Sequence, residues 1–180
     1  MKAIRILIWS ILLLLNCALL WADTGGPDGF DCSPKGDAPG FVRILDDKTL
    51  AIPDRPGNNR LDGFRNILRD PRIALLFLIP GVGETFRGNG RASISVDPEL
   101  MRSFAGNGKL PRSVLIIHIE TAFFHCSKAI VRSKLWDPAT QIDRKSLPST
   151  GTIIAEVSHG KLGGEKYDRE APEKIKAQLY

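Results

Sequence analysis

The clearest candidate chemistry in this sequence lies in one segment, AIPDRPGNNRLDGFRN, at residues 51–66. Its pattern predicts a strand, a loop and then a helix, and four polar side chains precede the helix: Arg55, Asn58, Asn59 and Arg60. The free backbone N–H groups and the dipole at a helix N-terminus attract anions. Arginine can bind a phosphate through two parallel hydrogen bonds, and Gly57 would let a ligand approach the backbone closely. The segment therefore predicts a phosphate-binding loop, with an ordinary capped surface loop as the alternative.

Two other segments contain basic residues that could face a ligand. In FRGNGR, Arg87 and Arg91 lie four residues apart on a predicted strand and share one face of it, which could face a ligand or solvent. In FFHCSKAIVRSKLWDP, Lys128 and Trp136 would place a cation and a flat ring near a cleft, although Trp136 would also suit a hydrophobic core. The sequence contains no GxxxxGKS or GxxxxGKT motif, so it does not support an NTPase-type phosphate loop.

The cysteines and histidines form no recognisable catalytic or metal-binding pattern. His125 and Cys126 are neighbours at the end of a predicted strand, so their side chains point to opposite faces and do not favour a thiol–imidazole pair. The three cysteines and three histidines lack the paired spacings of a zinc site. We therefore predict no metal site, and reduced thiols in a reducing compartment.

Length and composition describe a globular protein with a net positive charge. The chain has 180 residues, of which 43% are hydrophobic and 25% charged, which suits one domain with a hydrophobic core. The formal net charge is +5 and the pI is about 9.3. The basic residues are scattered near glycines rather than gathered in one run, which favours a discrete anion site over a nucleic-acid surface. We therefore predict no nucleic-acid partner.

Residues 1–17 form a hydrophobic leader. Lys2 and Arg5 precede an apolar run at residues 6–15, which is typical of a secretory signal. The apolar stretch is near the lower length limit for a transmembrane helix, so membrane contact is predicted only through residues 1–22.

The alternative interpretation is that residues 18–24 form a buried first strand behind an atypical start. We favour this interpretation because cleavage after a leader would delete most of the strand. It predicts a cytoplasmic protein with one domain at residues 18–180, and a membrane-anchored or exported protein remains the alternative.

About six strands, separated by short helices, are predicted along the chain. Besides residues 18–24, strands are predicted at 41–45, 49–52, 73–79, 84–96 and 113–124, with a shorter one at 30–33. Helices are predicted at 61–68, 127–135, 150–157 and 171–179, and after the cap formed by Asp97 and Pro98. A parallel sheet would need a long helix between strands, so this spacing predicts a closed or half-closed antiparallel barrel of the α+β class.

Two patterns predict which side chains face the core. Leu61, Phe64 and Leu68 fall on one face of the helix at 61–68. Four side chains share one face of the longest predicted strand: Leu115, Ile117, Ile119 and Thr121.

Three segments together resemble the pyridoxamine 5′-phosphate oxidase-like family, and in particular its uncharacterised bacterial FMN-dependent branch. They are SPKGDAPGFVRILDDKTLAIPDRPGNNRLDGFRNIL, GETFRGNGRASISVDPEL and FFHCSKAIVRSKLWDP. The combination of PDRPGNNR with FHCSKA and LWDP is specific, and the resemblance covers roughly residues 18–180. The sequence departs from the family at Gly88, where a β-branched residue is expected, and at the leader, which replaces the family's opening helix.

The resemblance implies an antiparallel split β-barrel of the FMN-binding type with short peripheral helices. It also implies a homodimer that binds FMN in a groove between its subunits. By position, Arg55, Asn58, Asn59 and Arg60 match the phosphate-binding residues of the family. Other candidate cofactor-binding residues lie in the remaining segments that resemble the family: Ser33, Lys35, Arg87, Arg91 and Lys128.

The function implied by the resemblance is an FMN-dependent oxidoreductase that acts on an unidentified small molecule. The flavin would carry most of the chemistry, so no catalytic residue is assigned. Two alternatives remain open: a non-enzymatic flavin- or haem-binding protein, and an N-terminally altered family member without a cofactor.

Overall fold

The computed structural model describes residues 19–27, 29–57 and 60–179. The predicted leader at residues 1–17 lies outside the described residues, as do Asn58 and Asn59 of the predicted phosphate loop. The chain divides into two compact units, residues 1–136 and 137–180. The prediction of one domain over residues 18–180 stays a prediction.

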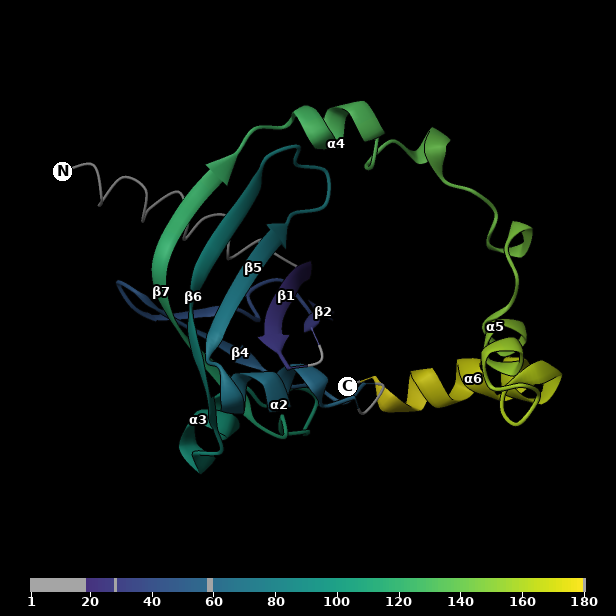
Figure 1. The fold of residues 1–180 in the computed structure, drawn as a ribbon, viewed down its shortest axis with the longest axis horizontal. Coiled ribbons are helices and arrows are strands. Elements are labelled where there is room, and N and C mark those ends of the chain that lie inside the picture. Colours follow the sequence, from purple (N-terminus) through teal and green to yellow (C-terminus); the bar gives the residue numbers. More distant parts are fainter. Residues whose placement is uncertain (1–18, 28, 58–59, 180) are drawn as a thin grey trace. The chain divides into compact units, whose positions relative to one another are not determined.

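The first unit contains one antiparallel sheet. Its strands are β1 (Leu19–Gly26), β2 (Gly29–Gly36), β3 (Arg43–Asp46), β4 (Thr49–Pro53), β5 (Arg72–Leu78), β6 (Thr85–Ser95) and β7 (Val114–His125). They form a 7-stranded sheet in the order β2-β1-β5-β6-β7-β4-β3, whose central strands curve together in Figure 1. Because β2 and β3 remain as edges, the barrel is split rather than closed. The predicted α+β antiparallel split barrel is confirmed, including a first strand that overlaps residues 18–24.

Three short helices belong to the first unit. α2 (Asp62–Arg69) and α3 (Pro98–Ser103) connect strands, and α4 (Lys128–Ser133) follows β7. The predicted cap of α3 is confirmed, since the Asp97 side chain accepts a hydrogen bond of 2.7 Å from the Leu100 N–H. α2 packs against β1, β2 and β6. Within the described ranges, no helix is both long and apolar enough to cross a membrane.

The hydrophobic core lies under α2, on one face of the sheet. Ile52, Leu75, Phe77 and Ile117 are at most 2% exposed, and Ile67 of α2 packs into the same cluster. Each such side chain contributes roughly 1.5–3 kcal/mol by leaving water. This burial fixes α2 on the sheet, and with it the loop that precedes the helix.

The predicted core face of α2 is wrong in part. Phe64 and Ile67 face the sheet, whereas Leu68 is 76% exposed and Leu61 is 48% exposed. The helix begins only at Asp62, so Leu61 lies outside it, and the buried pair has i,i+3 spacing rather than the i,i+4 spacing of the prediction.

The predicted face of β7 is also wrong at Thr121, because β7 contains a β-bulge. The register with β6 changes from Asn89 opposite Thr121 to Gly90 opposite Ile119, which leaves Glu120 as the extra residue. The bulge moves Thr121 to the opposite face, and Ala122 joins Ile119 against the core. Simple alternation cannot predict this shift.

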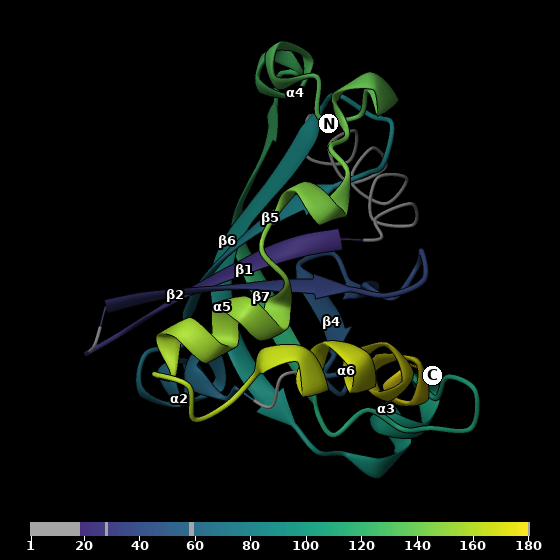
Figure 2. The same ribbon diagram turned by 90° about the vertical axis from the view of Figure 1, so that its right-hand side faces the viewer.

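The second unit is a pair of helices, α5 (Thr150–Val157) and α6 (Gly164–Gln178), which pack together (Figure 2). Two short 3₁₀ turns precede them, at Pro138–Thr140 and Arg144–Ser146. The Asp168 carboxylate of α6 caps α5 by accepting hydrogen bonds from the Gly151 N–H at 2.7 Å and the Ser149 hydroxyl at 2.5 Å. α6 begins earlier than the predicted residue 171, because Pro172 lies inside the helix rather than at its first turn.

We expect the bulge to make Gly90 hard to replace. A Cβ on Gly90 would lie 2.0 Å from the His118 carbonyl oxygen, which belongs to the backbone and cannot move aside. Gly90→Ala should therefore lower the free energy of unfolding by about 2–3 kcal/mol, measured by urea denaturation. Gly88→Ala is the matched control, because its Cβ would meet only the end of the Ile119 side chain, at 3.2 Å. Equal stabilities of the two variants would contradict this account of the bulge.

Candidate functional site

Two adjoining pockets lie where β2, the loop after β4 and the start of α2 meet. The first, called here the mixed-charge pocket, has a volume of about 190 Å³, and the second, the basic pocket, about 230 Å³. They share a wall made of Ser33, Pro34, Lys35, Arg60 and Phe64. A third pocket, along the outer side of α2, has a volume of about 350 Å³ and also includes Arg60.

The basic pocket is defined by its excess of positive charge. Its described lining contains four cationic side chains, Lys35, Arg55, Arg60 and Arg112, and one carboxylate, Asp54. The two arginines of the loop after β4 lie on the same pocket as Lys35 of β2. The arrangement can bind an anion with two or more negative charges.

Backbone hydrogen bonds bring Arg112 to this pocket. The Asp54 N–H donates to the Ser113 carbonyl at 2.9 Å, and the Arg112 N–H donates to the Asp54 carbonyl at 3.1 Å. These bonds extend the pairing of β4 with β7, in which Pro53 lies opposite Val114. The residue before β7 is therefore fixed beside the loop after β4.

Lys35 and Asp54 influence one another inside the basic pocket. Burial raises the pKa of Asp54, while the charges of Lys35 and Arg112 and a hydrogen bond with Ser113 oppose the rise. Burial lowers the pKa of Lys35, against the charges of Asp54 and Asp31. An anion in the pocket would supply further negative charge to Lys35 and favour its protonated form.

Arg55 is positioned by an ion pair. Its Nε donates to Asp37 Oδ2 at 2.8 Å, and the two side chains are only 15% and 11% exposed. Asp37 does not belong to the lining of the basic pocket. The pair therefore holds the Arg55 side chain in place without adding a carboxylate to the pocket wall.

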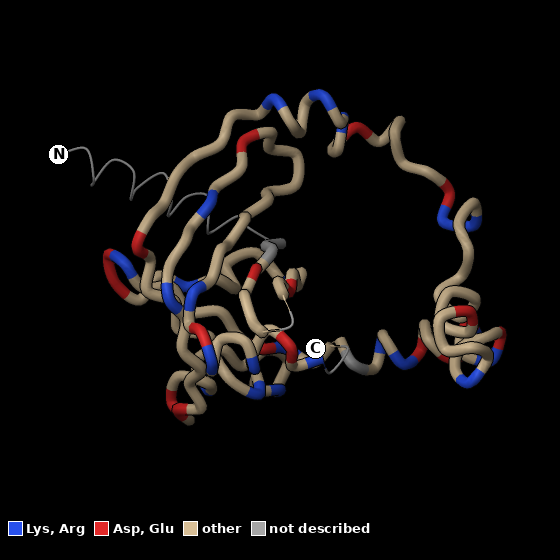
Figure 3. The backbone as a smooth tube through the Cα atoms, in the orientation of Figure 1, with Lys and Arg blue, Asp and Glu red and all other residues tan. Residues whose placement is uncertain are grey.

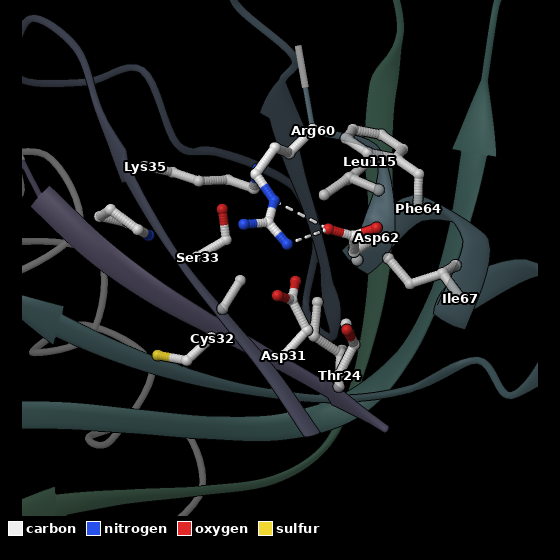
Figure 4. A pocket seen from close by; sticks show the side chains of 14 residues that line it. Thr24, Asp31, Cys32, Ser33, Lys35, Arg60, Asp62, Phe64, Ile67 and Leu115 are labelled. Carbon is white, nitrogen blue, oxygen red and sulfur yellow. Dashed lines mark hydrogen bonds and ion pairs between the residues drawn. The ribbon is translucent and has the colours of Figure 1, made fainter. Parts of the chain in front are cut away.

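The mixed-charge pocket has a different character (Figure 4). Its charged side chains are two cations, Lys35 and Arg60, and two carboxylates, Asp31 and Asp62. Arg60 donates two hydrogen bonds to Asp62 Oδ2, from Nε at 2.9 Å and from Nη2 at 2.7 Å. Apolar side chains complete the lining: Ala22, Phe64, Ile67, Ile73 and Leu115. Since its charges balance, this pocket is less suited to a dianion than the basic pocket.

The structure brings together four of the predicted cofactor-binding residues. Ser33, Lys35, Arg55 and Arg60 all line the basic pocket. β2 and β4 are not neighbours in the strand order, and the ion pair between Asp37, just after β2, and Arg55, just after β4, joins the two segments.

The other described candidates lie elsewhere. Arg87 and Arg91 share one face of β6, as expected, but neither lines the three pockets. The Arg87 guanidinium lies 4.9 Å from the centroid of Phe123, with Nη1 3.1 Å from Nε2 of His125. Lys128 is exposed at the start of α4. No cluster that could hold a metal ion occurs in the described part of the chain.

Sequence reasoning missed Arg112, Asp54 and Phe64. Arg112 is distant in sequence from the predicted loop, and only strand pairing reveals its position. Phe64 was assigned to the core, but its ring also lies 5.4 Å from Lys35 Nζ. Asp54 directly precedes Arg55, and this position in the predicted phosphate loop is the feature of the sequence that indicates a place in the pocket.

Cys32 of β2 is an exposed free thiol. Its partner Asp23 lies between Ala22 and Thr24 of β1, so the thiol is on the opposite face of the sheet from these two pocket-lining side chains. A hydrogen bond with Asp23, partial burial, and the charges of Asp23 and Asp31 raise the pKa of Cys32 to about 11. The thiol therefore stays protonated at neutral pH. Cys126, at the end of β7, is also a free exposed cysteine.

The fold and the pocket define a split-barrel protein with a basic pocket beside α2. A sequence model described as pyridoxamine 5′-phosphate oxidase matches residues 13–126, and the chain belongs to this family. A comparison with curated proteins finds no match. Figure 3 shows basic and acidic residues interspersed along the backbone, without one long basic run.

Solved structures share this fold at low sequence identity. HupZ of Group A Streptococcus is 24% identical, with a TM-score of 0.50, over 62% of this chain and 87% of that chain. General stress protein 26 of Bacillus anthracis is 17% identical, with a TM-score of 0.48, over 63% and 88% of the two chains. A related protein of Clostridium acetobutylicum is 14% identical, with a TM-score of 0.48, over 67% and 88%. At 24% identity, the likeness to HupZ concerns the fold alone.

Asp23→Asn should speed the alkylation of Cys32 by iodoacetamide at pH 8.5. The substitution removes the largest cause of the raised pKa, so more of the thiol ionises. Full return of the pKa from about 11 to 9.0 would increase the thiolate fraction about 100-fold. The lower nucleophilicity of the more acidic thiol reduces the gain to about tenfold, which is the upper limit expected. Peptide mass spectrometry would follow the reaction, with Cys126 as the internal reference, and an unchanged Cys32 rate would contradict the assignment.

Proposed function

We propose that this chain is an FMN-dependent oxidoreductase acting on a small organic molecule, and that the basic pocket binds the FMN phosphate. The observation that carries the proposal is the charge of this pocket, in which four cations face one carboxylate. A phosphate dianion would complement this charge. The pocket also lies within the part of the chain that matches the family.

The chemistry of the side chains fits a phosphate ester. Arg55, Arg60 and Arg112 can each offer a planar pair of N–H donors, and Lys35 offers a compact charge. The Ser33 hydroxyl provides a further donor at the shared wall. Asn58 and Asn59 remain proposed contacts on the evidence of the sequence alone.

The size of the pocket favours a site completed by a second subunit. Pockets for whole ligands usually measure about 300–1,000 Å³, whereas the basic pocket measures about 230 Å³. We therefore propose that the pocket holds the phosphate end, and that a homodimer covers the rest of the cofactor. Arg87, Arg91 and Lys128 remain proposed cofactor contacts through such a dimer.

In the proposed enzyme, bound FMN would supply the electron-transfer chemistry. The side chains described above bind and orient the cofactor through its phosphate. The side chains of the two pockets are consistent with these roles, because charged and apolar groups dominate the linings. No nucleophile–base pair is assigned among them.

The first test is an absorbance spectrum of the purified full-length protein, before and after addition of FMN and gel filtration. We expect flavin bands that stay with the protein, bleach on reduction with dithionite and return in air. A protein that remains colourless after incubation with FMN would overturn the proposal. Bound flavin that cannot be reduced would overturn the oxidoreductase assignment alone.

Arg112→Ala should weaken FMN binding by about 1–3 kcal/mol, as expected for a lost hydrogen bond to a charged group. Riboflavin, which lacks the phosphate, should bind the variant and the wild-type protein equally. Quenching of flavin fluorescence would measure both affinities. Arg102→Ala is the control, because Arg102 is exposed on α3 and lines none of the three pockets. An equal loss of riboflavin affinity would remove Arg112 from the phosphate site.

A further inference from the structure

Arg60 occupies a position that no other side chain shares among the described pocket linings. It lines the basic pocket, the mixed-charge pocket and the pocket along α2. A long, flexible cationic side chain at such a junction can bind an anionic group in any of the adjoining pockets. The hydrogen bonds of its guanidinium show which carboxylate it contacts.

In the described structure, the Asp62 carboxylate binds the Arg60 guanidinium. Both Nε and Nη2 donate to the same oxygen of Asp62, which is the first residue of α2. Asp62 lines the mixed-charge pocket and does not belong to the lining of the basic pocket. The contact therefore pairs the guanidinium with a carboxylate that the lining of the basic pocket lacks. The hydrogen bond with Asp62, and then the charges of Asp62 and Asp31, raise the pKa of Arg60.

We propose that Asp62 competes with the cofactor phosphate for Arg60, and so sets the affinity for FMN and its preference over riboflavin. The inference rests on the proposed function, since it takes the basic pocket as the phosphate site. Without ligand, Asp62 neutralises Arg60 over the mixed-charge pocket. A bound phosphate takes the guanidinium, and Asp62 becomes solvated.

The exposure of the pair makes this exchange feasible. The Arg60 side chain is 73% exposed and the Asp62 side chain is 41% exposed, so water can solvate the carboxylate once its partner leaves. Solvated ion pairs of this kind contribute little, and their loss changes a binding constant by about fivefold at most. A phosphate dianion carries more negative charge than the Asp62 carboxylate, and it accepts strong charge-assisted hydrogen bonds from arginine.

Arg55 provides the contrast within the same pocket. Its pair with Asp37 is nearly buried, at 15% and 11% exposure, and breaking it would leave a charge without solvent. The basic pocket therefore combines one fixed arginine with one that exchanges partners. The exchanging arginine makes affinity depend on the exposed Asp62 carboxylate.

The experiment measures dissociation constants of FMN and riboflavin for the full-length wild-type protein, Asp62→Asn, Arg60→Ala and the double variant. We expect Asp62→Asn to bind FMN about fivefold more tightly and riboflavin with unchanged affinity. In the Arg60→Ala background, Asp62→Asn should change the FMN affinity by less than twofold. Asp62→Ser is a second variant, in case Asn at the first residue of α2 impairs folding.

Asp70→Asn is the matched control. Asp70 pairs with Arg72 at the same i,i+2 spacing, with a shortest N–O distance of 2.5 Å, and lies outside the three pockets. Its loss removes the same charge and should leave FMN affinity unchanged. A similar gain from Asp70→Asn would indicate a general charge effect and overturn the exchange.

The outcomes separate this inference from the proposed function. If no variant and no wild-type protein binds FMN, both fail. If the wild-type protein binds FMN but Asp62→Asn and Asp62→Ser bind it equally or more weakly, only the competition is overturned. A gain that persists in full without Arg60 would also overturn it, because the carboxylate would then repel the phosphate directly.

Discussion

The pairing of β7 with two neighbours is the constraint on which the described site depends. β7 pairs with β6 along one edge and with β4 along the other. The β4 ladder ends in the backbone bonds that join Asp54 to Arg112 and Ser113. Since these bonds fix the loop after β4 beside the residue before β7, they bring residues that are distant in sequence to one basic pocket. The bulge at Glu120 then lets the long strand continue while its inward face changes.

The parts of the site that follow from short-range order could be predicted from the sequence. The order of strand, loop and helix follows from turn residues and periodicity, and it places Arg55 and Arg60 before α2 as expected. The parts that depend on register could not be predicted. Arg112 reaches the pocket only through the β4–β7 pairing, and the change of face at Thr121 follows from one extra residue in β7. Ile67 is buried instead of Leu68 because the sheet decides which face of α2 is covered. The sequence of the helix alone does not specify where the sheet lies.

Electrostatics divide the pocket walls into fixed and adaptable parts. The Arg55–Asp37 pair is shielded from water and behaves as part of the framework. The Lys35 ammonium and the Asp54 carboxylate are also partly buried, and each affects the ionisation of the other. Arg60 and Asp62 remain solvated, so their contact can form or break at little cost. The lining of the basic pocket thus contains one arginine of a nearly buried ion pair and one of a solvated ion pair.

The protonated state of Cys32 has a consequence for the chemical durability of the protein. Peroxide oxidises thiolates far faster than thiols, and the damage proceeds through sulfenic acid to irreversible products. Asp23 and Asp31 hold this cysteine in the thiol form, since its pKa is about 11. If the proposed cofactor generates peroxide when its reduced form meets oxygen, Cys32 will react slowly with that peroxide because its thiol form predominates. The exposed thiol of β2 can therefore persist without serving as a sacrificial target.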